Sequence, residues 1–310
     1  MEYRQFGRTG LRVSEVGLGF GPPGFDPEAD YTGLLRRAVD LGVNFIDTAD
    51  FYGAYRSEEW IGKALSSQRA DVIIATKFGS IHRDGQHRKD FSVAHMRRAL
   101  EESLTRLRTD YIDIYQLHSP PASALQNEDL LAALRELKQA GTIRFYGVSA
   151  DGQVALDAVE KWDVDAVQIM FSLFHQEPAD RFFPLALERE VGVIIRSPLD
   201  SGMLGGDLMP ESDAKVGDPR QRWGEEQTSL RQRLVEEIRF LSEGTGRTMA
   251  EAALQFVLSF EAVSVAIPGT TSVKHLEENA AAAGGRLSKD EMARLRSLQE
   301  GEFGDLNLGW

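Results

Sequence analysis

Along this chain, short runs of β-branched and aromatic residues alternate with longer segments in which apolar residues recur every three or four positions. The short runs predict buried strands, and the longer segments predict amphipathic helices. Ahead of them, the stretch Tyr3–Val13 turns at Gly7–Gly10 and predicts a hairpin. Strand followed by helix, repeated through the whole chain, is typical of parallel βαβ units.

The periodic segments define a series of predicted elements. Eight strands are expected, at Val16–Phe20, Val43–Asp47, Val72–Lys77, Tyr111–His118, Ile143–Ser149, Ala166–Met170, Val193–Arg196 and Val263–Ile267. Helices are expected at Tyr31–Leu41, Ser57–Leu65, Ser92–Leu107, Asp129–Ala140, Gln153–Lys161, Arg181–Glu190 and Val273–Ala283. Gly42, Gly141 and Gly192 each lie between a helix and the next strand, where a left-handed residue ends a helix at little cost.

Eight such units in 310 residues fit an α/β fold closed into a (β/α)8 barrel, the TIM-barrel architecture, with residues 1–310 as one domain. An open doubly wound sheet would carry a GxGxxG turn after its first strand. Here Gly17-Leu-Gly19-Phe-Gly21 lacks the final spacing and runs into Pro22-Pro23 instead of a helix. The sequence therefore favours the barrel.

Four segments extend the repeating pattern. The stretch 199–226 shows no clear period and is far longer than the roughly 12 to 15 residues of an ordinary connection, which predicts either a lid or a disordered segment. Its position after the seventh strand favours a lid. Extra helices are expected at Ser229–Ser242 and Thr248–Phe260. A last helix, Ser288–Leu298, begins with a capping box of Ser288 and Glu291.

Charge and composition narrow the range of partners. A formal charge of −13 argues against broad binding to nucleic acid or to anionic lipid, although a small anionic cofactor needs only a local basic cluster. The absence of cysteine excludes disulfides, thiolate catalysis and cysteine-ligated metals. No apolar run approaches the roughly 18 residues of a membrane span, and the first residues do not form a signal peptide. We expect a soluble cytoplasmic protein, of an oligomeric state that the sequence does not specify.

Three of the predicted strands end in a side chain that can hold or move a proton. Asp47, Lys77 and His118 close the second, third and fourth strands, and Tyr52 follows Asp47 by five positions. In a barrel the carboxyl ends of the strands open onto one face, with neighbouring strands about 4.8 Å apart. We therefore expect these four residues to meet at one rim and to form a catalytic site.

This set of groups permits proton transfer to a carbonyl oxygen. A tyrosine is a weak proton donor near neutral pH, and an adjacent ammonium improves it by stabilising the phenolate. Lys77 would supply that charge to Tyr52, and Asp47 would hold the lysine protonated. His118 would orient the carbonyl oxygen by a hydrogen bond. None of the four is a hydride source, so a reduction would need a cofactor.

The residues around these positions resemble the aldo-keto reductase family, and its bacterial members in particular. The matching segments are Phe6–Ser14, Asn44–Gly53, Ala75–Lys77, Tyr115–His118 and Ile267–Thr270. The resemblance implies a (β/α)8 barrel that transfers hydride from NADPH to an aldehyde or ketone without a metal. It also implies that Tyr52 is the general acid and base.

The resemblance further implies which residues hold the cofactor. Ser149 and Gln168 would hold the nicotinamide carboxamide. The loops after the last two strands, which are the usual anion site of a barrel, would take the phosphates and the adenosine. The residues implied at or beside those loops are Arg196, Ser197, Pro198, Leu199, Ser201, Gly202, Leu204, Ile267, Gly269, Thr270, Thr271, Lys274, His275, Glu278 and Asn279.

Some positions depart from the family pattern. Ala150 stands where many members have asparagine, so one carboxamide hydrogen bond is missing or comes from elsewhere. Arg196 stands where many members stack an aromatic ring on the nicotinamide; its planar guanidinium can stack, and its charge would favour the reduced ring. NADPH is the expected cofactor and NADH the alternative, because the family's basic position after Ile-Pro is Gly269 here, which leaves Lys274 and His275 for a 2′-phosphate.

Other interpretations remain open. Taken singly, each of the four rim residues is more often structural, and only their joint occurrence indicates catalysis. A redox sensor or scaffold subunit with slow turnover, of the kind that potassium-channel β subunits resemble, would keep both the barrel and the cofactor. A metal-dependent sugar isomerase or hydrolase would need clustered metal ligands, which the sequence does not contain. Four phenylalanines fit either the lining of a substrate pocket or core and loop packing, and we favour packing: Phe171, Phe174, Phe182 and Phe183. We expect structural roles for His82, His87, His95 and His175.

Overall fold

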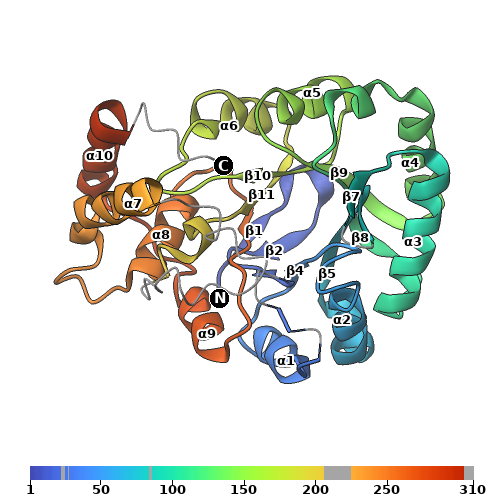
Figure 1. Ribbon diagram of the computed structural model, residues 1–310, viewed down its shortest axis with the longest axis horizontal. Helices are drawn as coiled ribbons and strands as arrows, with labels where there is room; N and C mark the ends of the chain where they lie inside the picture. The colour runs from blue at the N-terminus through green and yellow to red at the C-terminus, as the bar shows by residue number, and fades with distance from the viewer. Residues whose placement is uncertain (22–24, 27, 84–85, 206–224, 304–310) are drawn as a thin grey trace.

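The computed structural model describes residues 1–21, 25–26, 28–83, 86–205 and 225–303. Eight parallel strands form one curled sheet (Figure 1). In order around the sheet they are β3 (Leu18–Gly19), β4 (Phe45–Asp47), β5 (Ile73–Phe78), β8 (Ile112–His118), β9 (Ile143–Ser149), β10 (Ala166–Met170), β11 (Gly192–Arg196) and β12 (Val265–Ala266). Parallel bridges from Val16 to Ala266 and from Gly19 to Gly269 join the two ends. The sheet is therefore closed, and the predicted (β/α)8 barrel is confirmed.

Helices cover the outside of the barrel. In Figure 1, α1 to α6, α8 and α9 follow one another around the strands, while α7 and α10 lie further out on the left. The helices are α1 (Thr32–Asp40), α2 (Ser57–Leu65), α3 (Val93–Leu107), α4 (Glu128–Gln139), α5 (Gly152–Trp162), α6 (Pro178–Glu188), α7 (Glu225–Glu237), α8 (Met249–Leu258), α9 (Val273–Ala281) and α10 (Lys289–Leu298). The predicted strands and helices are all present, with ends that shift by a few residues, as helix and strand ends usually do.

The amino-terminal hairpin closes one end of the barrel. β1 (Tyr3–Gln5) pairs antiparallel with β2 (Arg12–Ser14), and Figure 1 shows the pair at the centre of the ring of helices. Phe6 and Val13, both fully buried, pack with inward-facing strand residues such as Phe45 and Ile114 into one apolar cluster. A second and larger cluster fills the space between the strands and the helices. The two clusters together hold the strands at fixed positions, and with them the side chains at their ends.

Two of the three predicted helix-ending glycines behave as expected. Gly42 and Gly141 have φ values of +85° and +77°. The prediction for Gly192 is wrong, because the left-handed residue after α6 is Glu190, with φ of +50°, and Gly192 is the first residue of β11. Glycine is required at 192 for a different reason: a Cβ there would lie 2.3 Å from the Phe6 ring. This glycine makes room for the hairpin.

The structure adds one element and clarifies others. A short hairpin, β6 (Ser80–Arg83) with β7 (Gln86–Lys89), follows β5 and was not predicted. The capping box of Ser288 and Glu291 at the start of α10 is confirmed. Most of the predicted lid, 206–224, lies outside the described residues. The phenylalanines expected in the core are there: the ring of Phe171, for example, lies 4.8 Å from that of Phe183. Within the described residues no helix is long and apolar enough to cross a membrane.

Removing the aromatic ring of the hairpin tests this account of the fold. Phe6→Ala leaves a cavity between the hairpin and the strands, and we expect it to lower the free energy of unfolding by about 3–5 kcal/mol. Urea denaturation measures this loss. Leu187→Ala, on an exposed side chain of α6, is the control and should change stability by less than about 0.5 kcal/mol. Equal effects of the two substitutions would contradict the proposed role of the hairpin.

Candidate active site

Asp47 and Lys77 form an ion pair at the end of β4 and within β5. Lys77 Nζ lies 2.5 Å from Asp47 Oδ1 and donates a second hydrogen bond of 2.7 Å to the Thr48 carbonyl. The exposed fraction is 0% for Lys77 and 3% for Asp47. Burial raises the pKa of Asp47, and the Lys77 ammonium opposes that shift. Loss of either partner would leave an uncompensated charge inside the barrel.

Two glutamines bind the other carboxylate oxygen of Asp47. Gln168 Nε2 donates a hydrogen bond of 2.7 Å to Oδ2, and Gln116 Nε2 donates one of 3.2 Å. Ser149 Oγ in turn donates to Gln168 Oε1 at 3.3 Å. The predicted carboxamide-binding residues and the ion pair thus belong to one network. Sequence reasoning missed Gln116, although it lies two positions before His118 and therefore on the same face of β8.

Tyr52 and His118 lie beside this network at the open end of the strands. Lys77 Nζ is 5.1 Å from the centre of the Tyr52 ring. The ring centres of Tyr52 and His118 are 5.6 Å apart in an edge-to-face arrangement, and the ring of Phe51 stacks on His118 at 5.2 Å. The structure therefore brings together all four residues that the sequence placed at one rim.

The segment between β4 and α2 fixes the position of Tyr52. Ser57 Oγ lies 2.7 Å from Thr48 Oγ1 and donates a hydrogen bond of 2.9 Å to the Phe20 carbonyl. Gly21 packs directly against the tyrosine: its φ is +112°, and a Cβ there would lie 2.7 Å from Tyr52 Cβ. Both contacts join the Tyr52 segment to the loop that leaves β3, so two adjacent strands determine where the phenol lies.

A buried carboxyl group, Asp50, lies between Asp47 and Tyr52 in sequence. Burial raises the pKa of Asp50 to about 7, and the Glu58 carboxylate adds to that shift. Glu58, which is fully buried, accepts hydrogen bonds of 2.8 Å from Arg106 Nε and 2.6 Å from Thr76 Oγ1. These bonds tie α2 to α3 and β5 beneath the Tyr52 segment.

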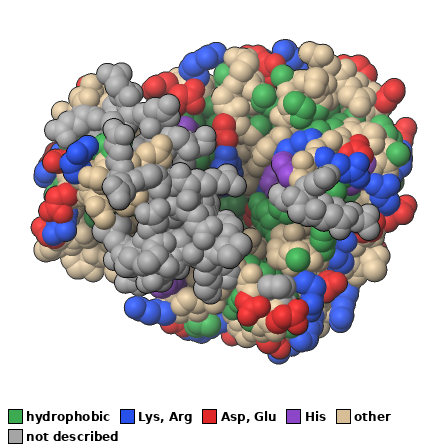
Figure 2. Space-filling model, viewed as in Figure 1, with side chains coloured by type: hydrophobic (Ala, Val, Ile, Leu, Met, Phe, Trp, Pro, Cys, Tyr) green, Lys and Arg blue, Asp and Glu red, His purple; other side chains and the backbone are tan. Residues whose placement is uncertain are grey.

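A cavity of about 520 Å³ extends from Asp47 and Tyr52, past the loop after β11, to the first turns of α9. Figure 2 shows this face of the molecule hollowed at its centre, with basic and histidine side chains at the margin of the hollow. Most of the predicted cofactor residues line the cavity: Gln168, Arg196, Ser197, Pro198, Leu199, Ser201, Gly202, Ile267, Gly269, Thr270, Thr271, His275, Glu278 and Asn279. Three do not: Ser149 lies behind Gln168, Leu204 is fully buried, and Lys274 is exposed on α9.

The chemistry of the cavity wall fits a dinucleotide with phosphate groups. Thr270 and Asn279 are polar side chains that line the cavity yet are only 6% and 3% exposed. α9 begins beside them, and the positive end of its dipole favours an anion. On the opposite wall, Ser197 and Ser201 adopt left-handed φ values of 53° and 54°. Such strain in residues other than glycine is concentrated at binding sites.

Several residues at this end of the barrel were not among the predicted site residues. The cavity is also lined by Gly19, Phe20, Gly21, Gly205, Ala250 and Pro268. Of the three glycines of the incomplete dinucleotide fingerprint, Gly19 and Gly21 line the cavity. In the unpredicted hairpin, Lys89 Nζ donates hydrogen bonds of 2.5 Å to Ser80 Oγ and 2.9 Å to the His118 carbonyl. No signal in the sequence linked Lys89 to His118.

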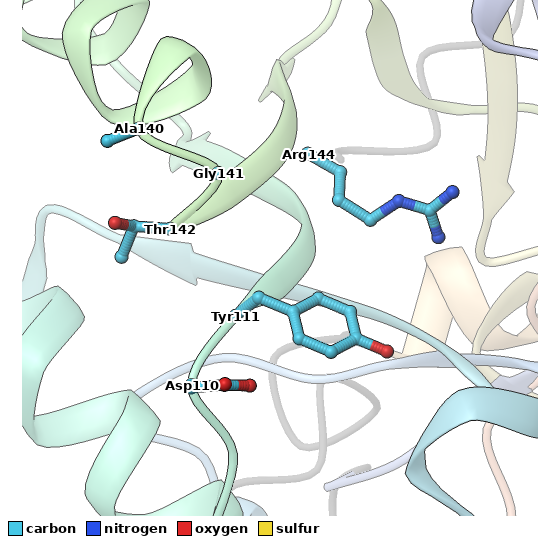
Figure 3. Close-up of a pocket in the computed structure, with 6 residues that line it drawn as sticks. All are labelled: Asp110, Tyr111, Ala140, Gly141, Thr142 and Arg144. Atoms are coloured by element: carbon cyan, nitrogen blue, oxygen red, sulfur yellow. The ribbon is translucent and has the colours of Figure 1, made fainter.

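A second cavity, of about 450 Å³, lies at the other end of the barrel, where β8 and β9 begin (Figure 3). Its lining residues are Asp110, Tyr111, Ala140, Gly141, Thr142 and Arg144. Arg144 Nη1 is already paired with Asp113 at 2.7 Å, and none of the predicted site residues lies there. Among the described residues no group of three or more histidine, aspartate or glutamate side chains is placed to hold a metal ion.

Comparisons with known proteins agree with the fold and identify the family. The model of the aldo/keto reductase family matches residues 17–300. An uncharacterized oxidoreductase of Bacillus subtilis, YqkF, is 36% identical over 304 residues, 96% of each chain. The holo form of aldo-keto reductase AKR11C1 from Bacillus halodurans superposes with a TM-score of 0.81 at 30% identity, covering 96% of each chain.

A third protein of the same fold is an aldo/keto reductase from Klebsiella pneumoniae, solved in complex with NADP and acetate. It matches with a TM-score of 0.74 and 27% identity over 96% of this chain and 94% of that one. The chain described here belongs to the aldo/keto reductase family, a family of oxidoreductases that use nicotinamide cofactors.

The loop after β11 contains an acidic group in an unusual environment. Asp200 is fully buried, and neither of its carboxylate oxygens has a hydrogen-bond partner among the described residues. Burial raises the pKa of Asp200 to about 7, although the Arg231 charge opposes this shift. Its sequence neighbours Leu199 and Ser201 line the cavity.

This raised pKa predicts a pH-dependent stability. The folded state binds the Asp200 proton more tightly than the unfolded state, so the stability that Asp200 contributes is lost as pH rises from about 4 to about 7. Asp200→Asn cannot titrate. We expect it to match the wild type at pH 4 and to be more stable at pH 8 by on the order of 2–4 kcal/mol.

Urea unfolding at several pH values measures the difference. Asp290→Asn, which removes an exposed carboxylate from α10, is the control and should leave the wild-type pH dependence unchanged. A constant stability difference between Asp200→Asn and the wild type from pH 4 to pH 8 would show that Asp200 ionises normally in the folded protein.

Proposed function

We propose that this protein is an NADPH-dependent reductase that converts a small aldehyde or ketone to an alcohol, with Tyr52 as the proton donor. One observation carries the proposal: a phenol lies beside a buried ammonium–carboxylate pair at one end of a cavity whose wall fits a dinucleotide. The family to which the chain belongs supports the reaction class.

Each of the four rim residues has a separate role in proton transfer. Tyr52 donates its hydroxyl proton to the carbonyl oxygen, which becomes the hydroxyl of the product. The Lys77 ammonium stabilises the phenolate that remains, and Asp47 keeps the lysine charged and in place. His118, beside Tyr52, donates a hydrogen bond that holds the carbonyl oxygen. The product alcohol leaves, and the phenolate regains its proton from solvent.

A reduced nicotinamide, when bound, supplies the hydride that the four side chains cannot provide. Gln168, which lines the cavity, would bind its carboxamide; it also donates to Asp47 and so has one amide hydrogen left to give. Ser149, which does not line the cavity, would orient Gln168 through its hydrogen bond to Oε1. The loop after β11 and the start of α9 would bind the phosphates. His275, which lines the cavity, and the exposed Lys274 would bind the 2′-phosphate that distinguishes NADPH from NADH.

A slow cofactor-binding sensor is the second candidate function. The same cavity and the same wall would serve a subunit that reports the redox state of its bound cofactor. The complete Asp47–Lys77 pair beside Tyr52 favours the enzyme, because a sensor has no need for a positioned proton donor. The two functions differ in turnover and share cofactor binding.

Titration of NADPH fluorescence with the purified protein, followed by a panel of aldehydes, ketones, quinones and sugars, separates these functions. Binding with turnover supports the reductase. Binding without turnover on any carbonyl supports the sensor. If the protein binds neither NADPH nor NADH, both the reductase and the sensor proposal are contradicted.

The first substitution tests the proton donor. Tyr52→Phe keeps the ring but removes the hydroxyl, and we expect kcat to fall at least ~100-fold, the usual scale for loss of a general acid. NADPH affinity should stay within about threefold of the wild type, which shows that the cavity is intact. Steady-state kinetics and fluorescence titration measure the two quantities, and an unchanged kcat would remove Tyr52 from the mechanism.

The second substitution tests the buried charge. Lys77→Met removes the ammonium beside Tyr52, and we expect turnover at neutral pH to be lost, because an unassisted phenol is too weak an acid to protonate the carbonyl oxygen. The alkaline limit of any residual activity should move to higher pH, where the unassisted phenol still holds its proton. The variant also leaves Asp47 without its charged partner, so we expect the free energy of unfolding to fall by about 3–5 kcal/mol. We would measure activity between pH 6 and pH 10, after circular dichroism has shown that the variant is folded. This pH profile tests the role of the lysine. Normal activity at neutral pH would contradict the role of the lysine.

A further inference from the structure

At the wall of the cavity, Arg196 forms an ion pair that the sequence did not reveal. Arg196 is the last residue of β11, and its Nη2 donates a hydrogen bond to Asp151 Oδ2. Asp151 lies 45 positions earlier, in the loop between β9 and α5. The side chains are 33% and 39% exposed, so the pair stands at the edge of the cavity and is not buried in the core.

The carboxylate of Asp151 is held in place by the backbone. Its Oδ1 accepts a hydrogen bond of 2.9 Å from the Met170 N–H at the end of β10. Asp151 precedes the first residue of α5, where an aspartate usually accepts hydrogen bonds from the N–H groups of its own helix. Here its side chain makes no such bond. The carboxylate is turned away from α5 and towards Arg196.

The guanidinium also belongs to the proposed nicotinamide end of the cavity. Arg196 lines the same cavity as Tyr52 and Gln168, and Met170, which holds Asp151, is paired with Arg196 across the two strands. A positive charge at this position disfavours the oxidised nicotinamide, which is itself cationic, relative to the neutral reduced ring. The carboxylate beside the guanidinium offsets that effect.

We propose that Asp151 is a positioning residue that holds Arg196 and neutralises it, and that this pair sets the relative affinity of the cavity for oxidised and reduced nicotinamide cofactor. The proposal rests on the proposed function, since it requires a nicotinamide dinucleotide in this cavity. Asp151 need not touch the cofactor. Without it, Arg196 would present an uncompensated charge and would strongly favour the reduced form.

Other charged groups near the pair do not change its net charge at pH 8. His175 interacts electrostatically with both members of the pair, and burial lowers its pKa, so the imidazole is neutral at that pH. Asp151 and Arg196 then carry opposite unit charges. The quantity to measure is therefore the dissociation constant for NADP⁺ divided by that for NADPH, both at pH 8. NADPH fluorescence gives the NADPH constant, and displacement of bound NADPH by NADP⁺ gives the NADP⁺ constant.

The three variants of the pair give distinct predicted ratios. Asp151→Asn, which leaves only the positive charge, raises the ratio by about 3–10-fold, as expected for one charge acting over several ångström in a partly exposed site. Arg196→Gln, which leaves only the negative charge, lowers it. The double variant has no charge, and its ratio returns to within about twofold of the wild type. A tenfold change in the ratio is a shift of about 30 mV in the potential of the bound cofactor.

A matched control comes from the same helix. Asp157 pairs with Lys161 at 2.7 Å on α5, away from the cavity lining. Asp157→Asn removes the same chemical group and should leave the ratio unchanged. If the Asp151–Arg196 pair only supported the fold, its variants would weaken both nucleotides by the same factor, and the ratio would not move.

The outcomes are distinguishable from failure of the proposed function. Opposite shifts in the two single variants, cancelling in the double variant, support the proposal. Equal ratios in all variants, or shifts of the same sign, overturn it and leave the reductase proposal intact. Failure of the wild type to bind either nucleotide overturns both.

Discussion

The ion pair of Asp47 and Lys77 is the interaction on which the candidate site depends. Two opposite charges inside a barrel are stable only if each is compensated, and here the lysine is bonded to the carboxylate and to the Thr48 carbonyl while two glutamines satisfy the other carboxylate oxygen. That arrangement holds an ammonium group 5.1 Å from the centre of the Tyr52 ring. A solvated lysine on the rim would be neither as fixed nor as effective in stabilising a phenolate, because water would screen its charge.

The barrel makes this arrangement possible by controlling register. Lys77 pairs with Gln116 across β5 and β8, and Ser149 pairs with both His118 and Gln168 across β8, β9 and β10. Side chains two apart on a strand face the same way, so a shift of one residue in any strand would turn its polar group out of the barrel. The hairpin at the other end contributes indirectly, because Phe6 and its neighbours fill the interior that keeps those strands in place.

The fold and the rim residues could be predicted from the sequence because both depend on local patterns of apolar and polar residues. The strands β4, β5 and β8 are apolar runs with a polar residue at or near the end, and topology brings their ends together. The hairpin β6–β7 was missed because its residues are polar and charged and lack alternation. The pairing of Asp151 with Arg196 and the contact of Gly192 with Phe6 join distant segments, so neither leaves a local signal. The burial of Asp200 likewise becomes visible only in three dimensions.

The central claim is that the cavity between Tyr52 and α9 holds a nicotinamide dinucleotide with its reactive ring at the buried ion pair. A crystal structure of the protein grown with NADPH tests it most directly. The account predicts the nicotinamide beside Tyr52 and Gln168, and the phosphates between the loop after β11 and the start of α9. A dinucleotide bound elsewhere on the barrel, or bound in this cavity with its adenine beside Tyr52, would contradict it.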